Sequence, residues 1–270
     1  MDKAEFFVQS HDGLKLHVVK QDPGSAKAVV VMAHGLGEYA GTFSWLAGQL
    51  NDAGFITYQP DHRGHGRSEG ERAHLDDYRD LAKDFKVTVD RAAAENPDKK
   101  IFLYGHSMGG MTVALCGLMY PELPVSGAVT SGAVVCEFQN LFGSVPEDLD
   151  DHEVLPNTLR KAICSVPERL QEFLDDPMST LFNTAGCARQ ICRGDEWIHS
   201  NMEKFTWPVL ITHGGDDEIV SPRDSIEFFR LAGAKDRQLK LYGGSHHALF
   251  NDICREEFAE DTVEWITRRI

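Results

Sequence analysis

The segment Gly105-His106-Ser107-Met108-Gly109 lies directly between two apolar stretches of different length. The stretch before it, Ile101–Tyr104, suits a short buried strand, and the stretch after it, Met111–Tyr120, suits a helix. A serine flanked by glycines at a strand-to-helix junction is the signature of a nucleophile elbow, in which small neighbours let strand and helix approach closely and the hydroxyl points out of the turn. The amide of Met108, at the helix N-terminus, then points at the same spot. The junction predicts Ser107 as a nucleophile.

A serine hydroxyl is a weak nucleophile at neutral pH and needs a base, which in turn needs an orienting acid. Two later strand candidates, Pro208–Thr212 and Leu239–Tyr242, are each followed by a loop that carries such groups. The candidates come as two adjacent pairs, Asp216 and Asp217 in the first loop, and His246 and His247 in the second. Acid and base thus follow the serine in the chain order of an α/β-hydrolase. The residues alone leave open which member of each pair serves.

The rest of the chain alternates between strand and helix patterns. After a hairpin start within residues 5–31, the sequence predicts a helix at 44–52, a strand at 55–59, an amphipathic helix at 76–95 and a strand at 125–130. Such alternation predicts a mostly parallel sheet of about eight strands covered by helices on both faces. Ligands of such sheets bind at the carboxyl ends of the strands, where all the candidate residues fall.

The alternation breaks between about Cys136 and Phe205, a stretch with four prolines and only helical spacing. We expect a core made of residues 1–135 and 206–270 and a helical insertion at 136–205. Apolar residues at helical spacing are Leu159, Ile163, Val166, Leu170, Phe173 and Leu174. Further apolar side chains are Leu141, Phe142, Leu149, Leu155, Leu181 and Phe182. We expect most of these side chains to pack on the body, and a minority to line an acyl tunnel or touch a lipid surface.

The formal net charge of −15 at pH 7 argues against binding to nucleic acid or to an anionic membrane surface. The first residues do not show the basic segment followed by an apolar segment that is typical of a signal peptide. No apolar run is close to the length needed to span a membrane. Six scattered cysteines form no disulfide framework, and the close pair Cys187 and Cys192 lacks a partner cluster for a metal. These features predict a cytoplasmic protein with reduced thiols and no metal.

Five stretches resemble the monoacylglycerol lipase and lysophospholipase branch of the α/β hydrolases, which is similar to the S33 serine aminopeptidases. They are HGLGEYAGTF (34–43), PDHRGHGRSEGER (60–72), GHSMGG (105–110), HGGDDEIV (213–220) and LYGGSHHALF (241–250). The resemblance spans nearly the full length of the chain. It implies an α/β-hydrolase fold in which the insertion forms a lid.

The resemblance also assigns the remaining site residues. An H-G-x-x-D stretch places the acid at Asp217, and a Y-x-G-x-x-H stretch places the base at His247. The second oxyanion donor, beside the amide of Met108, is the amide of Leu36. Glu38 is either a contact for the alcohol end of the ester or a brace for its loop, and Thr42 is a further candidate substrate contact.

The family implies that the polar turn at 61–68 shapes a loop behind the site, with local hydrogen bonds from Asp61 and Arg63. His34 and His106 are expected to be structural. Relatives read E-H-S-G-R-Y where this chain reads Glu38-Tyr39-Ala40-Gly41-Thr42-Phe43. The missing arginine weakens the case for glycerol as the recognised alcohol.

The predicted function is therefore a serine hydrolase that cleaves carboxylic esters without a cofactor. Monoacylglycerols and lysophospholipids are the leading substrates, and short-chain or aryl esters, including plant phenolic esters, follow. A thioesterase or carbon–carbon hydrolase on the same fold, or a non-catalytic ligand-binding homologue, remains an alternative. The expected partners are a small ester or lipid and, through the lid, a transient membrane or micelle contact; neither nucleic acid nor a protein partner is implied.

Overall fold

The computed structural model describes residues 2–136, 138, 142, 145–157 and 162–270. Leu141 and Leu159, two apolar residues of the expected insertion, lie outside the described residues.

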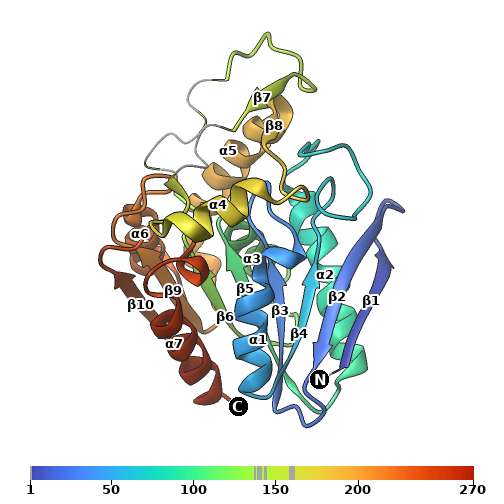
Figure 1. Ribbon diagram of the computed structural model, residues 1–270, viewed down its shortest axis with the longest axis vertical. Coiled ribbons are helices and arrows are strands. Elements are labelled where there is room, and N and C mark those ends of the chain that lie inside the picture. The colour runs from blue at the N-terminus through green and yellow to red at the C-terminus, as the bar shows by residue number, and fades with distance from the viewer. Residues whose placement is uncertain (1, 137, 139–141, 143–144, 158–161) are drawn as a thin grey trace.

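The chain is organised around one eight-stranded sheet (Figure 1). In their order across the sheet the strands are β1 (Asp2–Gln9), β2 (Lys15–Asp22), β4 (Phe55–Pro60), β3 (Ala28–Ala33), β5 (Lys100–His106), β6 (Val125–Ser131), β9 (Val209–Gly214) and β10 (Arg237–Tyr242). The first two strands pair antiparallel, and β2 also pairs antiparallel with β4. Every other neighbouring pair is parallel, which confirms the predicted sheet.

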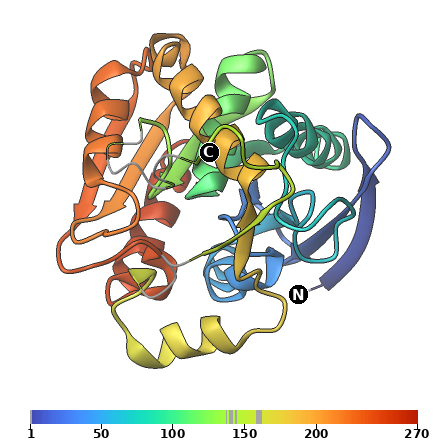
Figure 2. The ribbon, with the colours of Figure 1, turned by 90° about the horizontal axis from the view of Figure 1, so that it is seen from above.

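Helices cover both faces of the sheet, as the view from above shows (Figure 2). They are α1 (Ser44–Asp52), α2 (Arg79–Glu95), α3 (Met108–Met119), α4 (Pro167–Asp175), α5 (Ala185–His199), α6 (Pro222–Leu231) and α7 (Arg255–Thr267), with short 3₁₀ turns η1 (Ala40–Phe43), η3 (Met202–Lys204) and η4 (Leu249–Asn251). α1 and α7 contact each other on one face, whereas α2, α3 and α5 pack side by side on the other, and α6 packs on β9 and β10. The two helical layers bury both sides of the parallel strands.

Burial along the strands explains their sequence patterns. Every residue of β3, β4 and β9 is buried, as expected for parallel strands covered on both faces, and these strands read as apolar runs. The edge strand β1 is mostly exposed, and its sequence mixes polar and apolar residues. The core therefore lies on either side of the central strands.

The segment 136–205 is more varied than its sequence pattern indicated. It contains α4 and α5, but also a two-stranded antiparallel ribbon of β7 (Val154–Pro156) and β8 (Phe182–Thr184). The ribbon and α4 lie above the carboxyl ends of the sheet strands (Figure 1). α5 instead packs on α3 of the body, because it buries one face from Ala185 to Ile198. Three-residue strands carry too little periodicity to be predicted.

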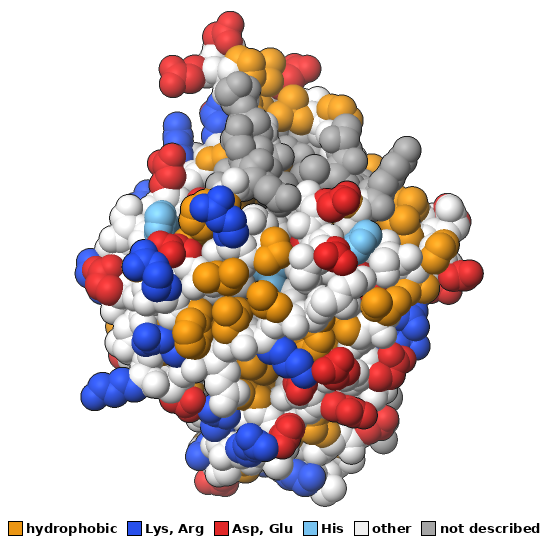
Figure 3. Space-filling model, turned by 90° about the vertical axis from the view of Figure 1, so that its left-hand side faces the viewer, with side chains coloured by type: hydrophobic (Ala, Val, Ile, Leu, Met, Phe, Trp, Pro, Cys, Tyr) orange, Lys and Arg blue, Asp and Glu red, His pale blue; other side chains and the backbone are white. Residues whose placement is uncertain are grey.

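Charge is distributed over the surface without a basic patch on the face that Figure 3 shows, where Lys and Arg side chains are interspersed with Asp and Glu. In the part of the chain that the structure describes, none of the helices combines the length and apolar character needed to cross a membrane. All six cysteines are free thiols.

Candidate active site

Ser107 occupies the sharp turn between β5 and α3. Its φ of 55° and ψ of −120° place a residue with a side chain in a region that such residues rarely adopt. The turn is held by its own amide, which donates to the carbonyl oxygen of Ser131 at 2.9 Å, and by the amide of Met111, which donates to the carbonyl oxygen of Ser107 at 3.1 Å. This is the geometry predicted for a nucleophile elbow.

The elbow can form only because its neighbours lack side chains. A Cβ atom on Gly109 would lie 2.0 Å from the carbonyl oxygen of Ala33 on the adjacent strand. A Cβ atom on Gly105 would lie 2.2 Å from the carbonyl oxygen of Gly109. Close contact between β3, β5 and α3 therefore explains the glycines of the motif.

Asp217 and His247 meet beside this turn. They follow β9 and β10, two neighbouring parallel strands whose carboxyl ends lie at the same edge of the sheet. His247 Nδ1 lies 2.7 Å from Asp217 Oδ2, while Oδ1 accepts hydrogen bonds from the amides of Ile219 at 2.8 Å and Val220 at 3.0 Å. Because Nδ1 donates to the carboxylate, Nε2 of His247 is left to accept a proton.

The adjacent members of the two pairs lie elsewhere. Asp216 is exposed, and its amide donates to the carbonyl oxygen of Ser245 at 3.0 Å. His246 is half-buried, and its amide donates to Asp252 Oδ2 at 2.7 Å. The structure thus brings together the two residues that the family pattern selected.

Asp217 is held as an anion by its surroundings. Burial alone would raise the pKa of its carboxyl, but electrostatic attraction to the nearby His247 and hydrogen bonds from His213 and His247 hold that pKa well below its usual range. His213 Nε2 lies 3.0 Å from Asp217 Oδ2 and 2.9 Å from the carbonyl oxygen of Val220, so this nitrogen carries the proton. Its Nδ1 then accepts from the Ser225 hydroxyl at 2.7 Å. In the sequence, His213 stands out only as part of the 213–220 stretch, and its contact with Asp217 was not predicted.

The loop after β3 lies against Ser107. A Cβ atom on Gly35 would be 3.1 Å from Ser107 Cβ, so the loop passes directly over the serine. Over the described residues, neither the amide of Leu36 nor that of Met108 donates to a protein acceptor. Two unpaired amides beside a nucleophile are what an oxyanion hole requires.

Glu38 is buried behind the same loop, at 1% exposure. Its Oε2 accepts from the amide of Gly35 at 2.7 Å, and its Oε1 lies 3.6 Å from His106 Nε2. Burial raises the pKa of Glu38 to about 8, although the Gly35 amide opposes the shift, so the carboxyl is mostly protonated at neutral pH.

His106 provides an independent reason for a proton on Glu38. Burial, and then electrostatic repulsion from the nearby His247 ring, hold the pKa of His106 well below its usual range, so the ring is neutral. Its Nδ1 donates to the carbonyl oxygen of Ser131 at 3.1 Å, which leaves the lone pair of Nε2 facing Glu38. A protonated carboxyl complements that lone pair, whereas a carboxylate would repel it.

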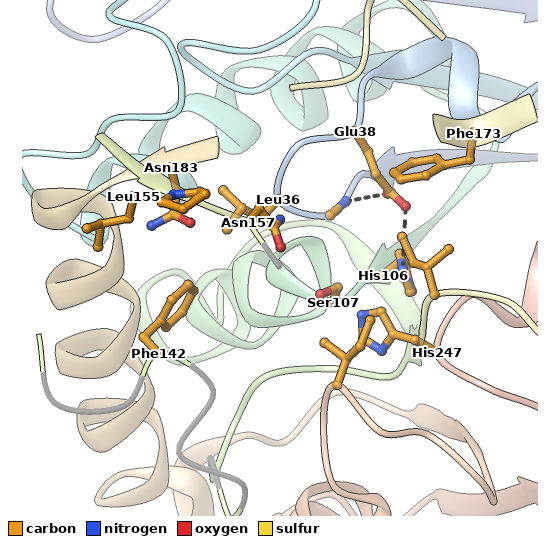
Figure 4. Close-up of a pocket in the computed structure, with 14 residues that line it drawn as sticks. Leu36, Glu38, His106, Ser107, Phe142, Leu155, Asn157, Phe173, Asn183 and His247 are labelled. Atoms are coloured by element: carbon orange, nitrogen blue, oxygen red, sulfur yellow. Dashed lines mark hydrogen bonds and ion pairs between the residues drawn. The ribbon is translucent and has the colours of Figure 1, made fainter. Parts of the chain in front are cut away.

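A cavity of about 180 Å³ opens over Ser107 (Figure 4). Ser107 lies between His247, His106 and Glu38 on one side and Asn157, Asn183 and Leu155 on the other. The described lining residues are Gly35, Leu36, Glu38, His106, Ser107, Phe142, Leu155, Pro156, Asn157, Ile163, Phe173, Asn183, Ile219 and His247. Several of them come from the insertion, which therefore forms one wall of the site.

Thr42 is not among the described residues that line this cavity. Its hydroxyl accepts from the amide of Tyr39 at 3.3 Å and so helps to shape η1. The structure places Glu38 at the cavity and Thr42 outside its described lining.

The polar turn after β4 supports the site from behind, as expected. Asp61 accepts from the amides of Ala40 at 2.6 Å and Arg67 at 2.9 Å, so it fixes both loops. His34 Nδ1 donates to the carbonyl oxygen of Gly35 at 2.8 Å, and its Nε2 accepts from the amide of His62 at 2.9 Å. These bonds fix the loop that carries Leu36.

Comparisons with known proteins agree with this geometry. A family model described as Serine aminopeptidase, S33 matches residues 24–253. The monoacylglycerol lipase of Mycolicibacterium smegmatis is 31% identical over 251 residues, covering 90% of this chain and 89% of that protein. The caffeoylshikimate esterase of Arabidopsis thaliana is 28% identical over 269 residues, covering 92% of this chain and 80% of that protein.

Among solved structures, the monoacylglycerol lipase of Paleococcus ferrophilus matches with a TM-score of 0.82 at 25% identity, covering 100% of both chains. The fold is thus that of the α/β hydrolases. Because the family model spans most of the sequence, the chain belongs to the serine aminopeptidase S33 family, in the α/β-hydrolase branch that contains monoacylglycerol lipases.

Proposed function

We propose that this chain hydrolyses carboxylic esters through an acyl-enzyme on Ser107, with His247 as general base and Asp217 as its orienting acid. The observation that carries the proposal is the strained turn of Ser107 at the cavity, beside a His247–Asp217 pair joined at 2.7 Å. Relatives named monoacylglycerol lipase at about 30% identity indicate the same activity, and the chain is an ester hydrolase of that type.

In the first half-reaction Ser107 Oγ attacks the acyl carbonyl while its proton passes to His247 Nε2. The carbon–oxygen bond to the alcohol then breaks, and the alcohol leaves with that proton. In the second half-reaction water attacks the acyl carbon, His247 again takes the proton and returns it to Ser107 as the acid leaves. Asp217 stays ionised throughout, because its surroundings lower its pKa.

The negative charge on the former carbonyl oxygen needs donors that are already in place. We assign this role to the amides of Leu36 and Met108, which are unpaired among the described residues. Glu38 is the proposed contact for the alcohol portion, since its carboxyl lines the cavity and its oxygens can accept a hydrogen bond from an alcohol. We do not extend that role to Thr42, whose hydroxyl is engaged with Tyr39.

Monoacylglycerols are the leading substrates, because relatives carrying that name match over most of the chain. A phenolic ester is the second candidate, favoured by the match to the caffeoylshikimate esterase. Asn157 and Asn183 contribute side-chain amide groups to the cavity wall opposite Glu38, as Figure 4 shows. Such groups can form hydrogen bonds with the hydroxyls of either substrate.

Residues 136–205 are proposed to act as a lid that selects the acyl group. Support comes from Leu155, Ile163 and Phe173, which line the cavity from this segment. Val154 and Leu181 expose apolar side chains on the same segment, which suits transient contact with a lipid surface. We also propose a cytoplasmic location, which the six free thiols support.

The nucleophile is tested by Ser107→Ala. We expect turnover of p-nitrophenyl esters to fall by about 10³-fold or more without loss of fold, and labelling by a fluorophosphonate probe to disappear. Near wild-type turnover in the folded variant would remove Ser107 from the mechanism.

The substrate class is tested by comparing kcat/KM for monoacylglycerols of increasing chain length, a caffeoyl ester, a small acetate ester and matched thioesters. A preference for monoacylglycerols supports the leading candidate. A preference for the caffeoyl ester would transfer the assignment to the second, and a preference for thioesters would overturn both.

A further inference from the structure

A second cluster of ionisable side chains lies outside the catalytic cavity. Glu71 and His74 belong to the loop after β4, and His152 belongs to the segment that leads into β7. One donor atom from each of these residues lies within 4.8 Å of the others. None of the three is among the described residues of the cavity above Ser107, so the mechanism leaves them unused.

We infer that Glu71, His74 and His152 bind a divalent transition-metal ion of the Zn²⁺ class, with Asp76 within reach as a further ligand. The bound ion would tie the loop after β4 to the segment before β7.

His74 is the fixed member of the cluster, because its side chain is only 6% exposed. Its Nδ1 lies 2.8 Å from Thr184 Oγ1. The Thr184 hydroxyl accepts from the amide of Cys187 at 3.1 Å and lies 3.3 Å from the carbonyl oxygen of Ala73, to which it can donate. In this arrangement Nδ1 donates to Thr184, and Nε2 offers its lone pair outward.

The lone pair of His74 Nε2 faces a carboxylate oxygen. His74 Nε2 lies 3.3 Å from Asp76 Oδ1. Either a proton or a cation must lie between these atoms for the contact to be favourable. A metal-bound histidine commonly donates its other ring nitrogen to a fixed oxygen, as Nδ1 does here to Thr184.

His152 and Glu71 complete the cluster from the other side. The rings of His152 and His74 are stacked, with centroids 4.6 Å apart and planes inclined by 16°. His152 Nδ1 lies 2.8 and 3.0 Å from the two carboxylate oxygens of Glu71. The side chains of His152 and Glu71 are 62% and 48% exposed, so both can move to bring their donors to a shared ion.

The donor set selects the class of ion. Two imidazoles with one or two carboxylates suit Zn²⁺ and its neighbours, which take four ligands at about 2.0–2.2 Å. Ca²⁺ and Mg²⁺ prefer all-oxygen sites. A chain with a net charge of −15 also attracts cations in general.

The site would reinforce a junction that the backbone already makes. The amides of Ala185 and Gly186, at the start of α5, donate to the carbonyl oxygens of Glu153 and Asp151, each at 2.8 Å. The amide of Thr184 donates to the carbonyl oxygen of Ala73 at 3.1 Å. The loop after β4, the segment before β7 and the start of α5 thus meet here. A metal ion would add a side-chain link between the first two, which carry its ligands.

The sequence predicted no metal site, because the ligands follow no local motif. Glu71 and His152 are 81 positions apart, and they meet only because the loop after β4 contacts the insertion.

The test uses untagged full-length protein, freed of metal with a chelator and titrated with Zn²⁺ by calorimetry. Co²⁺ is added in parallel, because its visible absorption reports nitrogen and oxygen ligation. We expect one Zn²⁺ per chain and a Co²⁺ spectrum that Zn²⁺ abolishes. His152→Ala and Glu71→Gln should each weaken binding by about 10-fold or more, while hydrolysis of a small acetate ester by these variants stays unchanged.

His199→Ala is the matched control, since His199 is also a half-exposed histidine near a glutamate, 3.7 Å from Glu227. It should bind Zn²⁺ as the parent does. Zn²⁺ should also slow proteolysis within residues 145–157 in the parent and not in His152→Ala. Weak binding without fixed stoichiometry, or His152→Ala binding like the parent, would overturn the proposal and leave an ion-pair cluster.

Discussion

Asp217 and Asp216 are neighbours in sequence and lie in opposite environments. Asp217 is buried and contacts two histidines, whereas Asp216 is exposed. Chemical type alone could not separate them, but the turn after β9 leaves the first carboxyl in solvent and places the second inside the protein.

Asp217→Asn should lower kcat for p-nitrophenyl esters by about 10³- to 10⁴-fold, because the amide no longer holds His247 in the tautomer that leaves Nε2 free. Asp216→Asn is the matched control and should remain within a few-fold of the parent. Steady-state kinetics on both proteins, with circular dichroism to verify folding, makes the comparison. If Asp216→Asn were the inactive variant, the assignment of the acid would be wrong by one residue.

Glu38 makes folding stability depend on pH. Its pKa is about 8 in the folded protein, above the ordinary value of 4.5, so the folded state holds the proton more tightly. The stabilising contribution is complete below about pH 4.5 and is lost as pH rises towards about 8.

Glu38→Gln removes this titration while keeping the shape of the side chain and an acceptor for the Gly35 amide. The loss of stability between about pH 5 and pH 8 should therefore be smaller in Glu38→Gln than in the parent. Urea unfolding at both pH values measures the difference. An unchanged pH dependence would show that Glu38 does not titrate in this range.

The protonation of Glu38 could not be predicted from the sequence, although the residue itself was singled out. Its pKa is raised by complete burial, which depends on how the rest of the chain packs around the loop after β3. Ser107 was predictable because its signal is local, consisting of glycines and two apolar runs. The cluster around His74 depends on long-range packing and carries no comparable signal.

At the scale of elements, the loop after β3 and the insertion are joined by polar contacts. The Tyr39 hydroxyl donates to Asp176 Oδ2 at 2.7 Å, at the end of α4. The amide of Thr180 donates to the carbonyl oxygen of Gly37 at 2.8 Å, and a Cβ atom on Gly37 would lie 2.5 Å from the carbonyl oxygen of Thr180. The loop that carries Leu36 is therefore attached to the proposed lid.

Tyr39→Phe should loosen this attachment, because it removes a hydrogen bond to a charged group, a kind worth about 1.5–3 kcal/mol. We expect faster hydrogen exchange at residues 176–181, and exchange in the central strands should not change. Tyr120→Phe, which removes a hydroxyl at the far end of α3, serves as the control. Equal exchange in Tyr39→Phe and the parent would mean that the hydroxyl does not hold the segment.

The core elements that the sequence predicted are those with a strong period or a long apolar run, whereas α6 and α7 were not predicted. α1 has the predicted bounds, and β4 and α2 differ only at their ends. The ribbon of β7 and β8 was not predictable, because three-residue strands are set by the pairing partner rather than by their own sequence. The start of α4 at Pro167 fits the preference of proline for the first helical turn, a signal that the helical spacing alone did not use.

At the scale of the whole molecule, Arg63 connects the N-terminal hairpin to the rest of the fold. Its guanidinium donates to Asp84 on α2 at 2.6 and 2.9 Å, to Asp12 in the hairpin turn at 3.0 Å and to Asp80 at 3.3 Å. The side chain is only 8% exposed, so these ion pairs are largely shielded from water.

Arg63→Met should destabilise the protein by about 3–5 kcal/mol, because it leaves buried carboxylates without a counter-charge. Arg79→Met is the control, since Arg79 is 57% exposed and its pair with Asp77 should contribute about 1 kcal/mol or less. Urea unfolding at neutral pH measures both. A loss from Arg63→Met no larger than that of the control would show that the cluster contributes little to stability.

The order of strands across the sheet also decides when the enzyme can become active during synthesis. β6 pairs with β9, but the whole insertion is made between them, so the edge of β6 stays open until the later strand emerges from the ribosome. Asp217 and His247 arrive with β9 and β10, after Ser107 has long been in place. A nascent chain therefore carries the proposed nucleophile before the proposed acid and base, so we expect no ester hydrolysis until the last strands have docked.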